Sequence, residues 1–375
     1  MSDNIPLEIQ MDIIQRFPDT KSLIRCRSVS KAWKSVIDSK DFVAAHTLRH
    51  QAHNQHLLIR TETRCDVYFP IDENRPEVKY LSIADDETVP PQNHVVFVPD
   101  SVKKFHSVIG TAYGLFALFL SKPDTVVIWN PFIRKTVEIP VPCEKHNVFG
   151  FGVCPRNLDP KLVKITFDSQ LQDGSTGTQV EVFSLSSGGT WRSPLSSNVP
   201  HRSIRFGGWP GHAVVDRFNY WIAYDSINVD DGPRDHILIM SFDLTSEEFV
   251  NVNLPDPLIH SEADLAILNL KGSLAVIEFE QTEVIHVWQM IGHGCTRSFN
   301  KLYSINGGDE SIHTIYVFRK SGAPIVDYNE ESDHPVRGLA TYEPESKSIT
   351  NMGIQLLNGN SSVHSYMETL LLVAH

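Results

Sequence analysis

A strand–turn–strand pattern that recurs along most of the chain constrains its fold more than any other feature. Each copy pairs two apolar stretches across a short polar turn, at residues 126–140, 180–194, 237–255, 284–305 and 339–354. One aromatic position recurs at intervals of 54, 59, 46 and 54 residues, at Trp129, Phe183, Phe242, Trp288 and Tyr342. A period near fifty residues with several strands per unit predicts a β-propeller.

A second repeated pattern lies between these copies, in which a glycine or turn residue precedes an apolar strand. Its instances are residues 114–120, 212–224, 270–279 and 323–328. Each unit therefore has about four strands, which is one propeller blade. Stacked blades cover the faces that a lone four-stranded sheet would leave exposed. Residues 57–375 divided by the period predict about six to seven blades, and residues 57–100 follow the pattern least well.

The first fifty residues have a helical pattern instead. Ile5, Ile9 and Ile13 recur four residues apart, and Pro18 interrupts the pattern. A second apolar stripe follows at spacings of three and four residues, at Cys26, Val29, Trp33 and Ile37. Helices this short cannot form a sufficient core by themselves. Their apolar stripes therefore pack either on the C-terminal body of the chain or against a partner protein.

Two further features of this region give local expectations. Pro6 is suited to the first turn of the first helix, where its missing N–H costs nothing. The helical pattern continues to about Gln55. In the repeat at 212–224, which belongs to the strand-rich body and not to this helical region, we expect a hairpin turn at residues 216–219.

The residues that fill the helical pattern resemble an F-box. The matching positions are Ile5-Pro6, Glu8-Ile9, residues 21–25, the run 29–37, and residues 38–42 with His46. An F-box binds the SKP-family adaptor of SCF (SKP–cullin–F-box) ubiquitin ligases. The resemblance therefore implies that adaptor, and cullin through it, as partners. The residues implied to face the adaptor are Ile5, Pro6, Ile9, Ile13, Leu23, Val29 and Trp33.

The body of the chain resembles the F-box-associated domain of plant F-box proteins, a kelch-like module. The matching stretches are residues 129–131 with Arg134, 149–152, 182–185 with Trp191 and Arg192, 302–305, 342–345, 364–366 and 368–370. The two resemblances imply a mostly β protein. It would consist of an all-α F-box module at residues 1–46, a helical linker at 47–56 and a kelch-like propeller at 57–375.

The charge and the cysteines limit the partners. The formal net charge is −12, although residues 1–50 carry eight Lys and Arg against six Asp and Glu. The body is therefore strongly acidic, which argues against binding nucleic acid through its phosphates. The five cysteines form no Cys-x-x-Cys pair and are odd in number, which is typical of reduced thiols. With no secretory signal or membrane-length apolar run, we expect a location in the nucleus, the cytoplasm or both, and no membrane partner.

Two groups of residues could carry chemistry, and each has a simpler interpretation. Gly150 and Gly152 resemble the start of a phosphate-binding loop, but Pro155 occupies the third position and no helix follows. We therefore expect a strand with small residues where blades pack closely. The acidic runs at 85–87 and 230–231 could hold a cation or a basic peptide, or could be solvated loops.

Histidines cluster at the end of the helical region, at His46, His50, His53 and His56. On one helix face they could bind zinc, but no Cys or carboxylate accompanies them, and a solvated helix end explains them equally. We therefore predict no metal and no cofactor.

The sequence predicts a non-catalytic protein that recognises substrates for an SCF ubiquitin ligase. Its F-box would bind the SKP adaptor and its propeller an unidentified target protein. Three alternatives stay open. The first is an S-locus-type F-box receptor that recognises a style ribonuclease, a class of target whose basic charge would suit the acidic body. The second is a propeller enzyme or sugar-binding lectin with an incidental helical N-terminus. The third is a scaffold that binds the adaptor without a role in ubiquitination.

Overall fold

The fold was analysed in a computed structural model of the chain. It describes residues 5–17, 19–50, 55–63, 77–86, 93–103, 107–121, 124–142, 147–168, 177–201, 203–207, 212–229, 232–281, 284–292, 297–306, 312–329, 337–356 and 361–373. The chain divides into two compact units. The first comprises Met1–Ile59, Lys79–Val141 and Ser365–His375, and the second comprises Arg60–Val78 and Pro142–His364.

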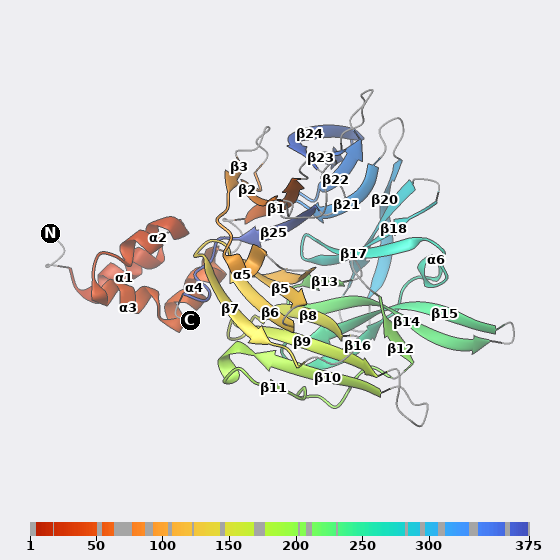
Figure 1. The fold of residues 1–375 in the computed structure, drawn as a ribbon. Helices are drawn as coiled ribbons and strands as arrows, with labels where there is room; N and C mark the ends of the chain where they lie inside the picture. The colour runs from red at the N-terminus through yellow and green to blue at the C-terminus, as the bar shows by residue number, and fades with distance from the viewer. Residues whose placement is uncertain are drawn as a thin grey trace, which may run out of the picture. The chain divides into compact units, whose positions relative to one another are not determined.

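Four helices begin the first unit, coloured red to orange in Figure 1: α1 (Leu7–Gln15), α2 (Thr20–Cys26), α3 (Lys31–Ile37) and α4 (Lys40–His50). Polar side chains fix where they start. The carboxylate of Asp19 caps α2 by accepting the N–H groups of Lys21 and Ser22, and Ser30 caps α3 by accepting the N–H of Trp33. Such caps satisfy backbone donors that have no partner inside the helix.

Two local expectations for the helices need correction. Pro6 is the N-cap of α1 and precedes the first helical residue, so it lies outside the first turn. The predicted continuation of the helix to about Gln55 is also wrong, because Gln55 begins strand β1. Local periodicity does not resolve such ends, since several residues beyond α4 are equally compatible with helix.

The first two sheets are built from strands before Val141 and one strand from the C-terminal region. The first sheet has the order β25 (Ser362–Met367), β1 (Gln55–Thr63), β2 (Glu77–Ala84) and β3 (Asn93–Val95). After the short helix α5 (Asp100–Lys103) comes the second sheet, with β4 (Ser107–Ala112), β5 (Leu115–Ser121), β6 (Asp124–Asn130) and β7 (Lys135–Pro140). Strand β25 thus pairs with β1, so strands from opposite ends of the described chain lie in one sheet.

The second unit contains four further antiparallel sheets, which we number third to sixth in chain order (Figure 1). The third has β8 (Asn147–Cys154), β9 (Asp159–Asp168), β10 (Gly177–Ser184) and β11 (Trp191–Arg192). The fourth has β12 (Ile204–Phe206), β13 (His212–Val215), β14 (Phe218–Val229), β15 (Gly232–Asp243) and β16 (Glu248–Val252). The fifth follows helix α6 (Asp256–Ile259) and has β17 (Asp264–Leu270), β18 (Ser273–Phe279), β19 (Val284–Ile291) and β20 (Ser298–Asn306). The sixth has β21 (Ile312–Phe318), β22 (Pro324–Asn329), β23 (Arg337–Glu343) and β24 (Ser348–Gln355).

The repeat in the sequence coincides with this sheet pattern. The five aligned aromatic residues lie in β6, β10, β15, β19 and β23, each the last but one strand of its sheet in chain order. The described residues form six sheets, within the predicted six to seven. The mostly β fold with a small helical N-terminal module is therefore confirmed. The expected turn at 216–219 is shorter than predicted, because Val215 already pairs with Phe218 and leaves only Asp216 and Arg217 in the turn.

Successive sheets of the second unit pack face to face through apolar side chains. Val163 and Val182 of the third sheet meet Trp221 of the fourth. Equivalent clusters join the fourth sheet to the fifth and the fifth to the sixth. This face-to-face packing buries the apolar faces that a single four-stranded sheet would leave exposed to water.

The glycines of β8 show how closely the third and fourth sheets approach. A Cβ atom at Gly150 would lie 2.4 Å from the Trp221 ring, and one at Gly152 would lie 2.3 Å from a methyl group of Leu244. The Trp221 ring nitrogen also donates a 3.1 Å hydrogen bond to the Phe149 carbonyl. The interpretation of this stretch as a closely packed strand is confirmed.

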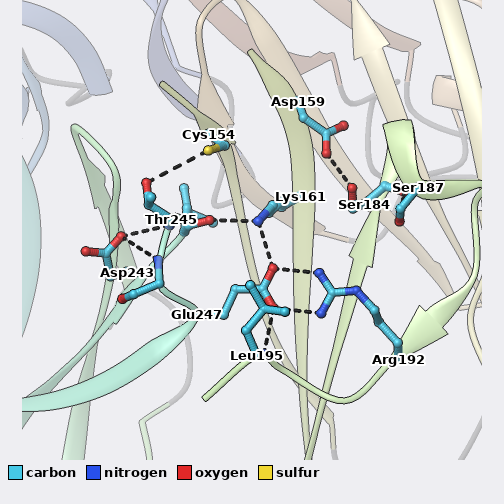
Figure 2. A network of polar contacts seen from close by, with 12 residues as sticks. Cys154, Asp159, Lys161, Ser184, Ser187, Arg192, Leu195, Asp243, Thr245 and Glu247 are labelled. Atoms are coloured by element: carbon cyan, nitrogen blue, oxygen red, sulfur yellow. Dashed lines mark hydrogen bonds and ion pairs between the residues drawn. The ribbon is translucent and has the colours of Figure 1, made fainter. Parts of the chain in front are cut away.

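A buried carboxylate ties the same two sheets together (Figure 2). Glu247, in the turn before β16, has no exposed surface and accepts 2.7 Å hydrogen bonds from Lys161 of β9 and from Arg192 of β11. It also accepts the Leu195 N–H at 3.0 Å, while Lys161 additionally donates to the Leu244 carbonyl at 2.8 Å. Burial alone would raise the pKa of Glu247, but the hydrogen bonds from Arg192 and Lys161 lower it to about 2. The group is therefore a charged, fully paired structural clamp.

The segment after β25 is anchored within the first unit. The Asn130 amide donates to the carbonyls of Thr369 and Leu371 at 3.1 and 2.8 Å, and Lys135 donates to the Val373 carbonyl at 3.0 Å. The hydroxyls of Thr369 and Thr47 of α4 lie 3.4 Å apart. Residues 369–373, which we call the C-terminal tail, are buried. The tail therefore contacts both the helical module and the second sheet.

Candidate adaptor-binding surface

Helix α1 presents an apolar stripe to solvent. Ile5 is 43% exposed, Ile9 52% and Ile13 46%, and Pro6 beside them is also exposed. The next residue, Ile14, is buried in the helical module. The isoleucines spaced four residues apart therefore face solvent, whereas Ile14 faces the interior of the module. Exposed aliphatic rows of this kind mark interaction surfaces.

Val29 and Trp33 extend the exposed surface to the region of α3. Val29 lies in the turn between α2 and α3 and is 65% exposed, while Trp33 is half-buried. The Trp33 ring nitrogen donates a 2.7 Å hydrogen bond to Oε1 of Gln10, and Nε2 of Gln10 donates to the Ile5 carbonyl at 2.6 Å. One amide thus joins the start of α1 to the tryptophan of α3.

Gln10 is a residue that sequence reasoning missed. It lies between two apolar positions of α1, and glutamine is a common solvent-facing helix residue, so the local pattern gave no signal. Its importance depends on Trp33, which is distant in sequence and comes close only in the folded module.

Leu23 differs from the other six residues implied to face the adaptor. It has no exposed surface and belongs to the helical core with Ile14 and Ile37. Its match to the family pattern therefore reflects packing within the module. The candidate adaptor-binding surface therefore comprises Ile5, Pro6, Ile9, Ile13, Val29 and Trp33.

Polar contacts hold the elements that carry this surface. Arg27 and Asp38 form a two-pronged ion pair at 2.6 and 2.8 Å, which links the end of α2 to the end of α3. The Ser22 hydroxyl donates to Asp19 and lowers the pKa of that carboxyl, so the cap of α2 keeps its charge to a lower pH than an ordinary Asp would. The Val29 turn is therefore bounded by fixed helix ends.

The alternative sites are less well assembled. His46 is buried and donates from Nε2 to the Phe17 carbonyl at 3.0 Å, while the side chain of His50 and all of His53 lie outside the described residues. Within the described residues, no three His, Cys, Asp or Glu side chains are placed to share a metal ion. Asp85 is buried and Asp86 exposed, and residues 87, 230 and 231 lie outside the described part of the chain.

No helix among the described residues is both long and apolar enough to cross a membrane.

Comparison with known proteins gives matches to two family models. The F-box domain model matches residues 2–44, and the F-box associated beta propeller domain model matches residues 67–366. The second match alone covers more than half of the chain. Together they account for the helical module and for the strands that follow it.

Curated relatives from Arabidopsis thaliana agree with the family models. F-box protein At3g07870 is 25% identical over 81% of this chain and 73% of its own length. F-box protein CPR1 is 25% identical over 98% of this chain and 89% of its own length. F-box/kelch-repeat protein At3g23880 is 22% identical over 84% of this chain and 83% of its own length. The chain belongs to the F-box proteins that carry an F-box-associated β-propeller domain.

Proposed function

We propose that this protein is the substrate-recognition subunit of an SCF ubiquitin ligase. The candidate adaptor-binding surface docks into an apolar groove of the SKP-family adaptor, and the propeller binds a target protein. The protein would act in the nucleus, the cytoplasm or both.

One observation carries the proposal. In an F-box module whose core includes Ile14, Leu23 and Ile37, an aliphatic row at α1 and the valine of the α2–α3 turn remain exposed. Exposed apolar side chains lose contact with water only when a partner covers them, and burial of each contributes about 1.5–3 kcal/mol. A helical surface of this kind fits a groove in another protein.

The contribution of such a subunit to ubiquitination is proximity. Holding a target beside the ligase raises the effective concentration of its lysines at the reaction centre, without a catalytic group in the receptor. The propeller suits this role because loops between strands vary without disturbing the sheets.

The test replaces exposed residues, so that folding is preserved. We expect Ile9→Ser with Val29→Ser to weaken binding to purified SKP-family adaptor by at least about tenfold in isothermal titration calorimetry. Leu48→Ser is the matched control, because Leu48 of α4 is 51% exposed and lies outside the candidate surface. It should bind as the wild type does, and circular dichroism should show all variants folded. Equal affinity of the double variant and the wild type would refute the assignment.

A further inference from the structure

Four cations of α2, α3 and the start of α4 stand apart from the other charges of the helical module. Arg16 pairs with Asp12, Arg27 with Asp38, and Lys21 lies 3.8 Å from Glu368. Within the described part of the chain, four exposed cations of α2 to α4 have no ion pair or hydrogen bond: Arg25, Lys31, Lys34 and Lys40. The single acidic residue between positions 25 and 40 is Asp38, whose carboxylate is already bound by Arg27.

Their positions surround the exposed valine along the chain. Arg25 is in the last turn of α2, Val29 follows in the turn, and Lys31 begins α3. Lys34 lies one turn further along α3, and the residues between it and Lys31 include exposed Ala32. The apolar contact point is thus bordered by positive charge before and after it.

The stability of the helices gives no reason for two of these charges. Lys31 and Lys40 are the first residues of α3 and α4. The partial positive charge at a helix N-terminus makes a cation there unfavourable by about 0.3–1 kcal/mol. Since the rest of the chain is strongly acidic, a local excess of unpaired cations is also not a property of the whole surface.

We infer that the groove of the adaptor that receives Val29 and Trp33 has an acidic rim, and that Arg25, Lys31, Lys34 and Lys40 pair with it. This inference rests on the proposed function. Charge pairs at the rim of an interface act mainly on the rate of association and on partner choice, because they steer the encounter before the apolar contacts form. The four cations therefore select an acidic adaptor, while the apolar surface sets how long the complex lasts.

The test measures association and dissociation rates with purified adaptor across a range of salt concentrations. For the wild type we expect the association rate constant to fall about tenfold between about 50 and 500 mM NaCl, because salt screens exposed charges. Lys31→Glu with Lys34→Glu should associate about tenfold more slowly at low salt, approach the wild type at high salt, and dissociate within about twofold of the wild-type rate.

A matched pair of substitutions controls for net charge. Lys271→Glu with Lys347→Glu changes the charge by the same amount at two exposed turn residues of the fifth and sixth sheets. We expect association of this control within about twofold of the wild type at every salt concentration. If both pairs of substitutions slow association equally, or if the wild-type association rate is independent of salt, the inference of an acidic rim is overturned.

Two further outcomes separate the inference from the function on which it rests. If the wild type binds the adaptor and its association does not respond to salt, the acidic rim is wrong while the receptor assignment stands. If the wild type does not bind the adaptor at all, the receptor assignment itself fails. Tighter binding of short duplex DNA than of adaptor, lost in the Lys31→Glu, Lys34→Glu variant, would show that the cations serve a phosphate backbone and would also overturn the inference.

Discussion

Single residues in this chain act through partners that are distant in sequence. Glu247 is the clearest example, since its carboxylate meets Lys161 and Arg192, which precede it by 86 and 55 residues. Nothing in the sequence around Glu247 marks it, because its turn resembles any exposed polar turn. The exposed row on α1, in contrast, is visible in the four-residue spacing of its isoleucines. Local patterns therefore predicted the isoleucine row and left open what covers it, and they did not predict the pairs that fix the interior.

Loss of the Glu247 charge should destabilise the second unit strongly. Glu247→Gln leaves two buried or half-buried cations without a counter-charge, which costs about 3–5 kcal/mol of unfolding free energy. Urea denaturation followed by circular dichroism measures the loss. The exposed Arg16–Asp12 pair provides the contrast, because Asp12→Asn should change the unfolding free energy by less than about 1 kcal/mol. Similar losses in both variants would contradict the clamp.

The depressed pKa of Glu247 also predicts an acid dependence. The carboxyl titrates at about 2 in the folded protein instead of its ordinary 4.5, so its stabilising contribution is complete above about pH 4.5. As the pH falls further, the unfolded chain takes up a proton that the folded protein refuses, and about 3 kcal/mol is lost on the way to pH 2. Unfolding free energies measured between about pH 3 and 6 should fall less steeply for Glu247→Gln than for the wild type. Parallel curves would exclude this residue as a source of acid sensitivity.

Gln10 should affect the adaptor-binding surface by positioning. Gln10→Ala removes the acceptor for the Trp33 ring nitrogen and the donor to the Ile5 carbonyl, and we expect adaptor affinity to fall about fivefold, equivalent to about 1 kcal/mol. Gln10→Glu keeps the acceptor for Trp33 and should recover part of the affinity. If the alanine variant binds with wild-type affinity, the hydrogen bonds of Gln10 do not orient this surface.

At the scale of elements, the strand pairs joined by short turns were predictable and the distant pairing was not. Each repeat copy in the sequence corresponds to the last two strands of one sheet in chain order, because neighbouring strands share a local pattern of apolar stretches and turn residues. Strand β25 joins β1 across nearly the whole chain, and no local spacing encodes such a partner. The two-residue turn at Asp216 was also misjudged, because Phe218 and Asn219 are as acceptable in a turn as in a strand.

The anchoring of the C-terminal tail gives a prediction at this scale. Asn130→Ala removes two hydrogen bonds to tail carbonyls and two to the turn that follows β6, so we expect a loss of about 2–4 kcal/mol. Asn269 is a suitable comparison, since it donates to the Val214 carbonyl and accepts the Gly272 N–H at an exposed turn. Asn269→Ala should lose about 1 kcal/mol. Thermal unfolding of the two variants checks the difference, and equal losses would show that the tail is not held by Asn130.

For the whole molecule, the sequence predicted a helical domain and a propeller domain, but it did not identify the target of the proposed function. The period near fifty residues predicted the propeller, and the helical stripes predicted a small module whose apolar faces need the body of the chain or a partner to cover them. The sequence does not identify residues for recognition of a target under the proposed function, because loop sequences vary without changing the sheets. Because loops and sheets vary independently, we expect the two proposed binding functions to be separable by mutation.

That separability can be tested in cells. We expect a chain with Ile9→Ser and Val29→Ser to capture the same target proteins as the wild type under proteasome inhibition, but without the adaptor and without ubiquitin on the targets. Quantitative mass spectrometry of the captured proteins provides the measurement. A set of targets that disappears together with the adaptor would show that the propeller does not bind them by itself. Leu48→Ser is again the matched control and should capture both adaptor and targets.

The pairing of β25 with β1 has a consequence for biosynthesis. Roughly 300 residues separate the two strands, and a ribosome that adds about 5–20 residues per second needs about 15–60 s to cover that distance. During this interval β1 lacks one of the two neighbours that it has in the finished sheet, while the helical module near the N-terminus has already been synthesised. The helices that carry the candidate adaptor-binding surface are therefore made before the first sheet is complete, and chaperones have a defined interval in which to shield the open edge of β1.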